Sequence, residues 1–162
     1  MPEVDALEGY EEKHVMSGKG KGVSIFFSKK LRLIDEPEKI SLHPFQIIKV
    51  RFCQVTVIVV YRSPQTDSHV MMLESLMQMV PGNSPTIICG DINTDPKHDP
   101  AQYNKLITKM ASKGFVQIID KPTHLQGGIL DHMYIRNIDV EYWQLHHPYY
   151  TDHDAICMQA KL

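Results

Sequence analysis

Thr86-Ile87-Ile88-Cys89-Gly90-Asp91-Ile92-Asn93-Thr94-Asp95-Pro96 is the stretch of sequence that decides the fold. It begins as an apolar run of strand length and ends abruptly in a glycine and a cluster of short polar side chains. This pattern is typical of a buried strand that delivers carboxylate and amide groups to the edge of a sheet. The candidate chemistry of the chain is therefore centred on Asp91.

The length and composition indicate a globular domain. The chain has 162 residues, of which 43% are hydrophobic and 22% are charged. This length predicts one domain over residues 1–162, and the hydrophobic content is enough for a packed core. The formal net charge of -2 gives the whole molecule no attraction for a polyanion. An anionic substrate therefore needs a local basic patch or metal ions.

The cysteines and the N-terminus bear on the compartment. Cys53, Cys89 and Cys157 lie in apolar runs and form neither a Cys-x-x-Cys pair nor a disulfide framework, so we expect small buried side chains in a reducing compartment. The acidic N-terminus lacks the apolar core of a signal peptide, and no apolar run approaches bilayer length. We expect a nuclear or cytoplasmic protein that is not secreted and does not associate with membranes.

Many strands and two helices are predicted. A turn at Gly9-Tyr10 leads into a short strand, and further strands are expected at 23–27, 45–51, 54–61, 86–89, 115–119, 129–135, 140–145 and 155–161. The β-branched run 55–60 is typical of a strand buried on both faces. Strands with two interspersed helices favour an α/β fold in which helices cover sheets.

The two helices are predicted from apolar spacing and end signals. The first spans 66–80, with Thr66 or Asp67 as N-cap, a stop at Pro81-Gly82 and a stripe of Val70, Leu73, Leu76, Met77 and Val80. The second begins at Asp99-Pro100 and ends at Gly114, with a stripe of Tyr103, Leu106, Ile107 and Met110.

One local cationic cluster is present near the N-terminus. The glycine-rich stretch 18–22 contains Lys19 and Lys21, and Lys29, Lys30 and Arg32 follow closely. The glycines lack the spacing of a phosphate-binding P-loop. The cluster is either a solvated hairpin face or an edge that contacts phosphates, and composition alone favours the solvated face.

Four polar clusters follow predicted strands. They are Tyr61-Arg62, Asp91 with Asn93, Asp131-His132, and Thr151-Asp152-His153-Asp154. Each has an ordinary structural explanation, such as an Asx-turn at Asp91 or a strand-end cap at His153. Their recurrence at strand ends, where loops of α/β scaffolds collect functional groups, favours a shared site.

Phosphodiester hydrolysis is the chemistry that suits these clusters. A hard divalent cation prefers the carboxylate and amide oxygens that Asp91, Asn93 and Asp152 offer. His153 can donate to a developing phosphorane oxygen while Asp131 fixes its tautomer. Cysteine is absent from the clusters, which argues against zinc.

Several motifs carry a family resemblance. Gly90-Asp91-Ile92-Asn93, Leu130 to Ile135 and Thr151 to Ile156 resemble the GDFN, LDHI and SDH motifs of the endonuclease/exonuclease/phosphatase superfamily, the DNase I-like fold. Val60 to Pro64, Lys121 to His124, the TDHDAI ending and Gly20 to Phe27 are similar to the endonuclease domains of non-LTR retrotransposons and related mobile elements. The matches follow family order from about Gly9 to the C-terminus.

The resemblance implies a fold and a set of roles. The fold is a two-sheet, four-layer α/β sandwich, and the activity is Mg²⁺-dependent DNA nicking, with Mn²⁺ as the other candidate ion. Asp91 activates water and binds metal, Asn93 holds the nucleophile or the metal, and Asp152 is a further ligand. Tyr61 contacts the scissile phosphate, His153 stabilises the transition state, and Asp131 orients His153. Arg62, Thr123, Lys19 and Lys21 contact the nucleic acid.

The chain departs from the resemblance at its N-terminus. The family's first strands bring an asparagine and a metal-binding glutamate before the segment that matches Gly9-Tyr10, so we expect the fold to be N-terminally truncated. The missing segment or a second chain is then expected to complete the sheet. The alternative to an endonuclease is a catalytically silent remnant that acts as a binding module or as half of a split domain. An unrelated structural α/β domain is the third reading.

Overall fold

The computed structural model describes residues 7–16, 22–64 and 69–162. Its strands are β1 Tyr10–Met16, β2 Gly22–Ser28, β3 Glu38–Leu42, β4 Phe45–Arg51, β5 Thr56–Arg62, β6 Thr86–Asp91, β7 Val116–Gln117, β8 Asp131–Arg136, β9 Asp139–His146 and β10 Ala155–Lys161. Its helices are α1 His69–Met79 and α2 Pro100–Ala111. Neither helix among these residues is long and apolar enough to cross a membrane.

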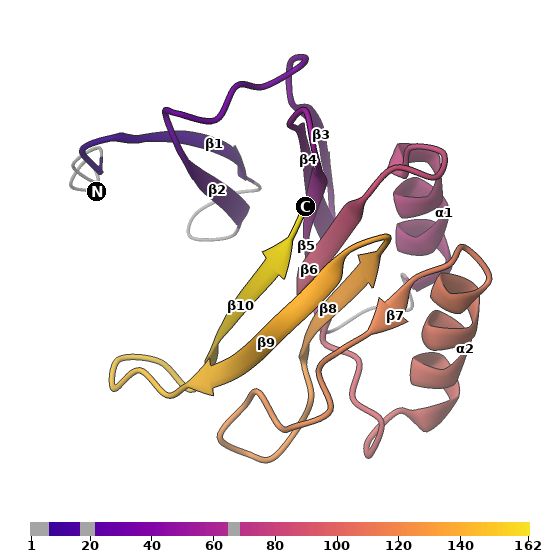
Figure 1. Ribbon diagram of the computed structural model, residues 1–162. Coiled ribbons are helices and arrows are strands. Elements are labelled where there is room, and N and C mark those ends of the chain that lie inside the picture. The colour runs from indigo at the N-terminus through magenta and orange to yellow at the C-terminus, as the bar shows by residue number, and fades with distance from the viewer. Residues whose placement is uncertain (1–6, 17–21, 65–68) are drawn as a thin grey trace.

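A six-stranded sheet forms the centre of the molecule. Its strand order is β3-β4-β5-β6-β8-β7, and only β5 and β6 run parallel to each other. Helix α1 makes the crossover between these two strands, and α2 lies beside it on the same face of the sheet (Figure 1). Two parallel neighbouring strands need such a crossover, because a tight turn reverses the chain direction and so joins only antiparallel strands.

The core lies between this sheet and the two helices. Fully buried side chains from four strands, among them Ile47, Ile58, Ile88 and Tyr134, pack against Met72 and Leu76 of α1 and Leu106 and Met110 of α2. Polar side chains at the strand ends surround this cluster. The core therefore fixes β6 and β8, the strands whose ends carry Asp91 and Asp131.

Gly90 allows β6 to end where it does. Its φ is +137°, and a Cβ placed there would lie 1.9 Å from the carbonyl oxygen of Val60 on the neighbouring β5. Only glycine fits such a close approach of two backbones. Asp91 is thereby placed at the end of β6, three positions after Ile88, the last buried residue of the strand.

The opposite face of the sheet is covered by β1 and β2. Val15 and Val23 of this hairpin pack on Ile48, with Val59 and Tyr61 partly buried beside them. The positions of β5 alternate between fully and partly buried. The prediction that the run 55–60 is buried on both faces is therefore wrong for one face, since the hairpin covers that face only in part.

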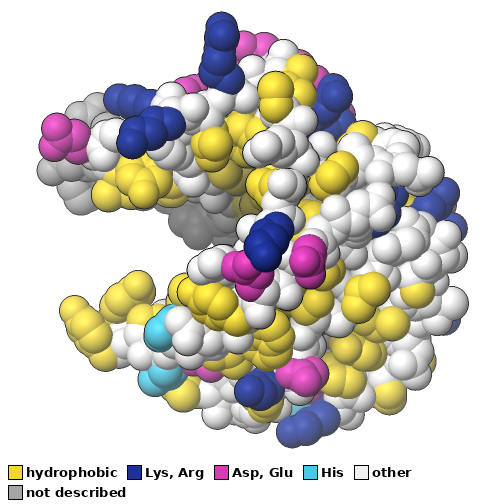
Figure 2. Space-filling model, viewed as in Figure 1, with side chains coloured by type: hydrophobic (Ala, Val, Ile, Leu, Met, Phe, Trp, Pro, Cys, Tyr) yellow, Lys and Arg dark blue, Asp and Glu magenta, His cyan; other side chains and the backbone are white. Residues whose placement is uncertain are grey.

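Strands β9 and β10 form a second hairpin, which pairs with neither β1–β2 nor the six-stranded sheet in the described residues. All their residues are half-buried or exposed. A notch opens between the two hairpins (Figure 2). The predicted α/β architecture with two layers of strands is confirmed, and both described helices cover the six-stranded sheet only.

The predicted helices are found with one shifted face. Asp99 caps α2, where its carboxylate accepts the Gln102 N–H, and Pro100 is the first helical residue as expected. In α1 the buried residues are His69, Met72, Leu76 and Met79, whereas Val70 is 65% exposed. The predicted stripe was therefore wrong at its first position, and the predicted N-caps lie outside the described residues.

Two further sequence predictions need correction. The strand expected at 115–119 shortens to Val116–Gln117, because the Gln117 side chain accepts the Met133 N–H and so occupies a ladder position. Cys53 and Cys157 are exposed instead of buried, and all three cysteines are free. Burial raises the pKa of Cys89 to about 11.

Candidate active site

The end of β6 and the start of β8 bring two carboxylates together. Asp91 and Asp131 are register partners in this antiparallel pair, so their side chains leave the sheet side by side. The connection between β9 and β10 adds His153, whose Nδ1–H donates to Oδ2 of Asp131 over 2.7 Å. The ligand atoms of these three residues all lie within 4.8 Å of one another, and we call them the inner site.

The electrostatics of the inner site favour a cation. Burial first, and then the charge of Asp131, raise the pKa of Asp91 to about 6. Partial burial works to lower the pKa of His153, but the hydrogen bond and charge of Asp131 outweigh it, so this pKa is raised. Asp91 and Asp131 lie close together, and the pKa of Asp91 is raised. A divalent ion would neutralise the combined charge of these two carboxylates.

Asn93 follows Asp91 in a left-handed conformation with φ +51°. Its N–H donates to Oδ1 of Asp91, and its side-chain amide donates to the carbonyl oxygen of Arg62. The Asx-turn considered for this pair is therefore present, and it holds the Asp91 carboxylate in place. The Asx-turn at Asp91 is thus part of the candidate site.

Tyr61 lies on β5, on the face covered by the β1–β2 hairpin. It is half-buried and packs beside Val59 and Ile48. Among the described residues it makes no hydrogen bond to the inner site. Its contact with a scissile phosphate remains a prediction.

Arg62 holds the loop that carries Asn93. It is 2% exposed, and its guanidinium donates to the carbonyl oxygens of Ile92 (2.8 Å) and Asn93 (2.7 Å). Its donors are directed at the protein interior. Arg62 therefore has a structural role, and its contact with nucleic acid remains a prediction.

Thr123 is likewise fully buried. Its hydroxyl accepts the N–H groups of Leu130 (3.1 Å) and Asp131 (3.0 Å) at the start of β8. Thr123 therefore positions Asp131, and its contact with a nucleic-acid backbone remains a prediction. Lys19 and Lys21, the other predicted contacts, lie outside the described residues.

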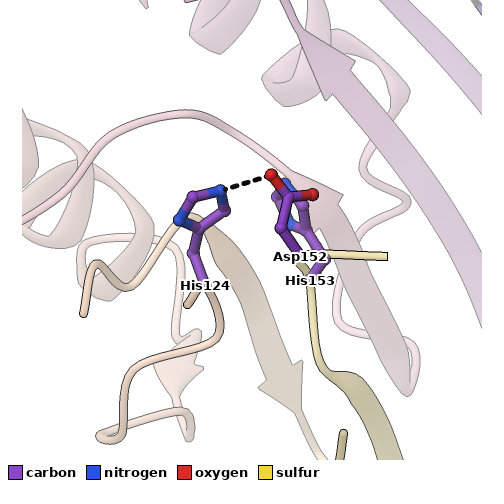
Figure 3. A group of neighbouring side chains, drawn as sticks. All are labelled: His124, Asp152 and His153. Atoms are coloured by element: carbon purple, nitrogen blue, oxygen red, sulfur yellow. Dashed lines mark hydrogen bonds and ion pairs between the residues drawn. The ribbon is translucent and has the colours of Figure 1, made fainter. Parts of the chain in front are cut away.

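Asp152 does not join the inner site. Its Oδ2 accepts the Nε2–H of His124 over 3.1 Å, and its side chain is 64% exposed. The Asp152 N–H, followed by His124, lowers the pKa of the Asp152 carboxyl. The ligand atoms of His124, Asp152 and His153 also lie within 4.8 Å of one another, and we call these residues the outer site (Figure 3).

Two residues without a predicted role also shape the site. His132 is fully buried: its Nε2–H donates to the carbonyl of Thr94 and its Nδ1 accepts the Tyr134 hydroxyl. Asp95 accepts the Ile129 N–H and pairs with His98. Burial acts to raise the pKa of Asp95, but these contacts outweigh burial, so the pKa is lowered. His132 and Asp95 fasten the loop after β6 to β8. In the sequence, the Asp95-Pro96 turn was the only signal for the role of Asp95.

Comparison with solved structures identifies the fold. No protein-family model matches the sequence, and no curated protein matches it. The chain has the DNase I-like fold of the endonuclease/exonuclease/phosphatase superfamily, as the motifs predicted.

Three neighbours illustrate the similarity. The endonuclease domain of TRAS1, a telomere-specific non-LTR retrotransposon, aligns with a TM-score of 0.64 and 16% identity over 93% of this chain and 77% of its own. An AP endonuclease from Archaeoglobus fulgidus aligns at 0.67 and 17% identity, covering 95% and 80%. An endonuclease/exonuclease/phosphatase family protein from Bacteroides thetaiotaomicron aligns at 0.68 and 15%, covering 95% and 74%.

Proposed function

We propose that the chain is a metal-dependent phosphodiester hydrolase that nicks DNA and derives from a mobile element. The observation that carries the proposal is the convergence of Asp91, Asp131 and His153 at one edge of the six-stranded sheet. The nuclease names of the structural neighbours support this reading. The motifs that carry the family resemblance supply the inner-site residues.

The inner site fits Mg²⁺, with Mn²⁺ as a substitute. Asp91 and Asp131 offer hard oxygen donors, and their proximity leaves negative charge that a cation would offset. The bound ion would polarise the phosphate and lower the pKa of its water. Asp91 would hold it, with Asn93 as the next candidate ligand, while Asp152 would have to leave His124 to take part.

The protein residues then divide the remaining work. Asp91 accepts a proton from the attacking water, since its carboxylate lies beside Asp131 and His153 at the centre of the inner site. Asp131 accepts from Nδ1–H of His153 and favours the protonated ring, so that Nε2–H faces the substrate and donates to a phosphoryl oxygen. The Tyr61 hydroxyl contacts the same phosphate.

A nucleic-acid substrate is favoured by an aromatic pair beside the site. Tyr149 and Tyr150 are 98% and 78% exposed, and their rings lie edge to face with centroids 5.4 Å apart. They immediately precede Thr151 in the connection that carries His153. Exposed aromatic rings stack on bases without sequence preference.

The test is hydrolysis of two substrates by the purified chain. Supercoiled plasmid reports nicking, and bis(p-nitrophenyl) phosphate reports phosphodiester hydrolysis without nucleic acid. We expect Mg²⁺-dependent nicking that EDTA abolishes and that Asp91→Asn lowers at least ~100-fold. Asp139→Asn, which removes an exposed carboxylate on β9, is the matched control and should retain full activity.

The possible results separate the readings. Hydrolysis of the small diester without nicking would reject DNA as the substrate and keep the phosphodiesterase. A folded chain that hydrolyses neither substrate would favour the silent remnant. Equal activity of Asp91→Asn and wild type would reject the inner site as the centre of the reaction.

A further inference from the structure

The outer site is assembled by the backbone of two loops. The Leu125 N–H donates to the Asp152 carbonyl over 2.9 Å, and the Asp154 N–H donates to the Thr123 carbonyl over 2.7 Å. Between these bonds His124 and His153 are antiparallel bridge partners. Main-chain pairing therefore places the two imidazoles side by side, with ring centroids 4.9 Å apart.

The side chains of the outer site present converging ligand atoms. Figure 3 shows His124 and Asp152 facing each other, and His153 beside Asp152. Nδ1 of His153 is engaged by Asp131, and within the described part of the chain its Nε2 has no hydrogen-bond partner. The His124 side chain is 12% exposed and so is held in place, whereas Asp152 is 64% exposed and leaves the site open to solvent.

We infer that the outer site binds a transition-metal ion such as Zn²⁺, and that this ion inhibits the enzyme by occupying His153. Two imidazole nitrogens and one carboxylate oxygen form a donor set that Zn²⁺ accepts with a water as fourth ligand. Mg²⁺ prefers oxygen donors and octahedral geometry, so it would not compete here. The expectation that zinc is unsuited to this chain rested on cysteine alone and did not include His124.

The contacts around the site favour this ion. Asp131 accepts from Nδ1 of His153, which is the carboxylate–histidine arrangement that orients a metal-bound imidazole through its other nitrogen. Asp131 holds the His153 ring, and the main-chain pairing of the two loops holds the backbone of His124 and Asp152. The site is therefore largely formed before an ion arrives.

Binding requires one proton to move. His124 now carries its proton on Nε2, where it donates to Asp152, and its Nδ1 accepts the Gln126 N–H over 3.2 Å. When Nε2 binds the ion, the proton moves to Nδ1 and the Gln126 contact is given up. This long, solvent-exposed contact is the only hydrogen bond besides His124–Asp152 that the described residues would lose.

Cobalt binding tests the site without reference to activity. Co²⁺ replaces Zn²⁺ in such donor sets and gives a visible absorption band when tetrahedral. We expect one Co²⁺ per chain, displaced by Zn²⁺ and unaffected by excess Mg²⁺. His124→Gln should weaken Co²⁺ binding at least ~10-fold.

Two variants serve as controls. His147→Gln removes an exposed histidine whose one ion-pair partner among the described residues is Asp154, and it should leave Co²⁺ binding unchanged. Asp91→Asn removes an inner-site ligand and should also leave it unchanged. Absence of the band, or equal Co²⁺ affinity of wild type and His124→Gln, would overturn the proposal. An equal loss in Asp91→Asn would assign the ion to the inner site instead.

The inhibitory consequence rests on the proposed function and is tested separately. Zn²⁺ should inhibit Mg²⁺-dependent hydrolysis by the wild type, and His124→Gln should require at least ~10-fold more Zn²⁺ for the same fractional inhibition, each variant being compared with its own zinc-free rate. Co²⁺ binding by a chain without hydrolase activity would reject the proposed function and keep the metal site. Hydrolysis that Zn²⁺ does not inhibit, despite binding, would reject the inhibition.

Discussion

The six-stranded sheet and the β9–β10 hairpin differ in how they are held. The sheet is packed against two helices and contains fully buried residues on four of its strands. The hairpin has no fully buried residue and pairs only with itself among the described strands. The inner site draws its carboxylates from the first region and its histidine from the second. The geometry of the inner site thus depends on how the less buried β9–β10 hairpin packs beside the helix-covered sheet.

The largest effect is expected where the rigid layer is tightest. Gly90→Ala would place a Cβ 1.9 Å from the Val60 carbonyl oxygen at a φ of +137°. We expect a loss of more than ~3 kcal/mol in the free energy of unfolding, measured by urea denaturation. Gly82→Ala is the control, because a Cβ at Gly82 meets nothing within 4 Å. Similar stability of the two variants would mean that β5 and β6 can separate without cost.

The same substitution in the two regions tests their difference directly. Ile88→Ala in the core of the sheet should cost about 3 kcal/mol, because it opens a cavity beside α1 and α2. Ile156→Ala in the half-buried β10 should cost about 1 kcal/mol or less. Urea denaturation measures both. Equal losses would show that the hairpin is as firmly packed as the sheet.

The docking of the hairpin is tested through the pair of residues that spans it. Asp131→Asn and His153→Gln should each lower kcat/KM about 100-fold, since each breaks the 2.7 Å hydrogen bond. Because the residues act as a unit, the double variant should lose little more than either single one. Multiplicative losses in the double variant would show that sheet and hairpin contribute independently.

The smallest expected effect is the pH dependence of folding stability that Asp91 and His153 cause. Without metal, the pKa of Asp91 rises from 3.8 to about 6 on folding, so the folded chain binds more protons between these values. Stability therefore falls as pH rises from 3.8 to 6. The raised pKa of His153 acts in a higher window: its contribution is present below 6.5 and lost as pH rises through the folded pKa.

Denaturation in EDTA from pH 4.5 to 7 measures the effect. The difference between wild type and Asp91→Asn isolates it, because the other titrating groups largely cancel. Mg²⁺ affinity should fall about tenfold per pH unit below 6, as protons compete for Asp91. A flat difference curve across this range would contradict the raised pKa of Asp91.

Local signals in the sequence predicted the rigid region well. The Gly90-Asp91 ending of β6 and the Asp99-Pro100 start of α2 depend on short motifs whose structure follows from the residues themselves. The pairing of Asp131 with His153 joins the two regions, and it was predicted from the chemistry of a carboxylate that orients a histidine. The burial of the β9–β10 hairpin could not be predicted from local motifs, because it depends on what packs against both faces of the hairpin.

Long-range contacts give Arg62 and Thr123 structural roles that the sequence did not predict. Arg62 and Thr123 are polar residues at strand ends, and sequence alone does not tell a substrate contact from a buried donor or acceptor that fastens a loop. The same limit explains His124. Its pairing with His153 is set by a register between loops about thirty residues apart, which no local pattern reports.

The bridge between His124 and His153 has a consequence for protein engineering. Because Leu125 and Asp154 exchange main-chain hydrogen bonds with Asp152 and Thr123, the loop before β8 and the loop before β10 form one structural unit. A graft of either loop from another protein of this fold would displace the histidine carried by the other. Specificity can be transplanted into this scaffold only by moving both loops together.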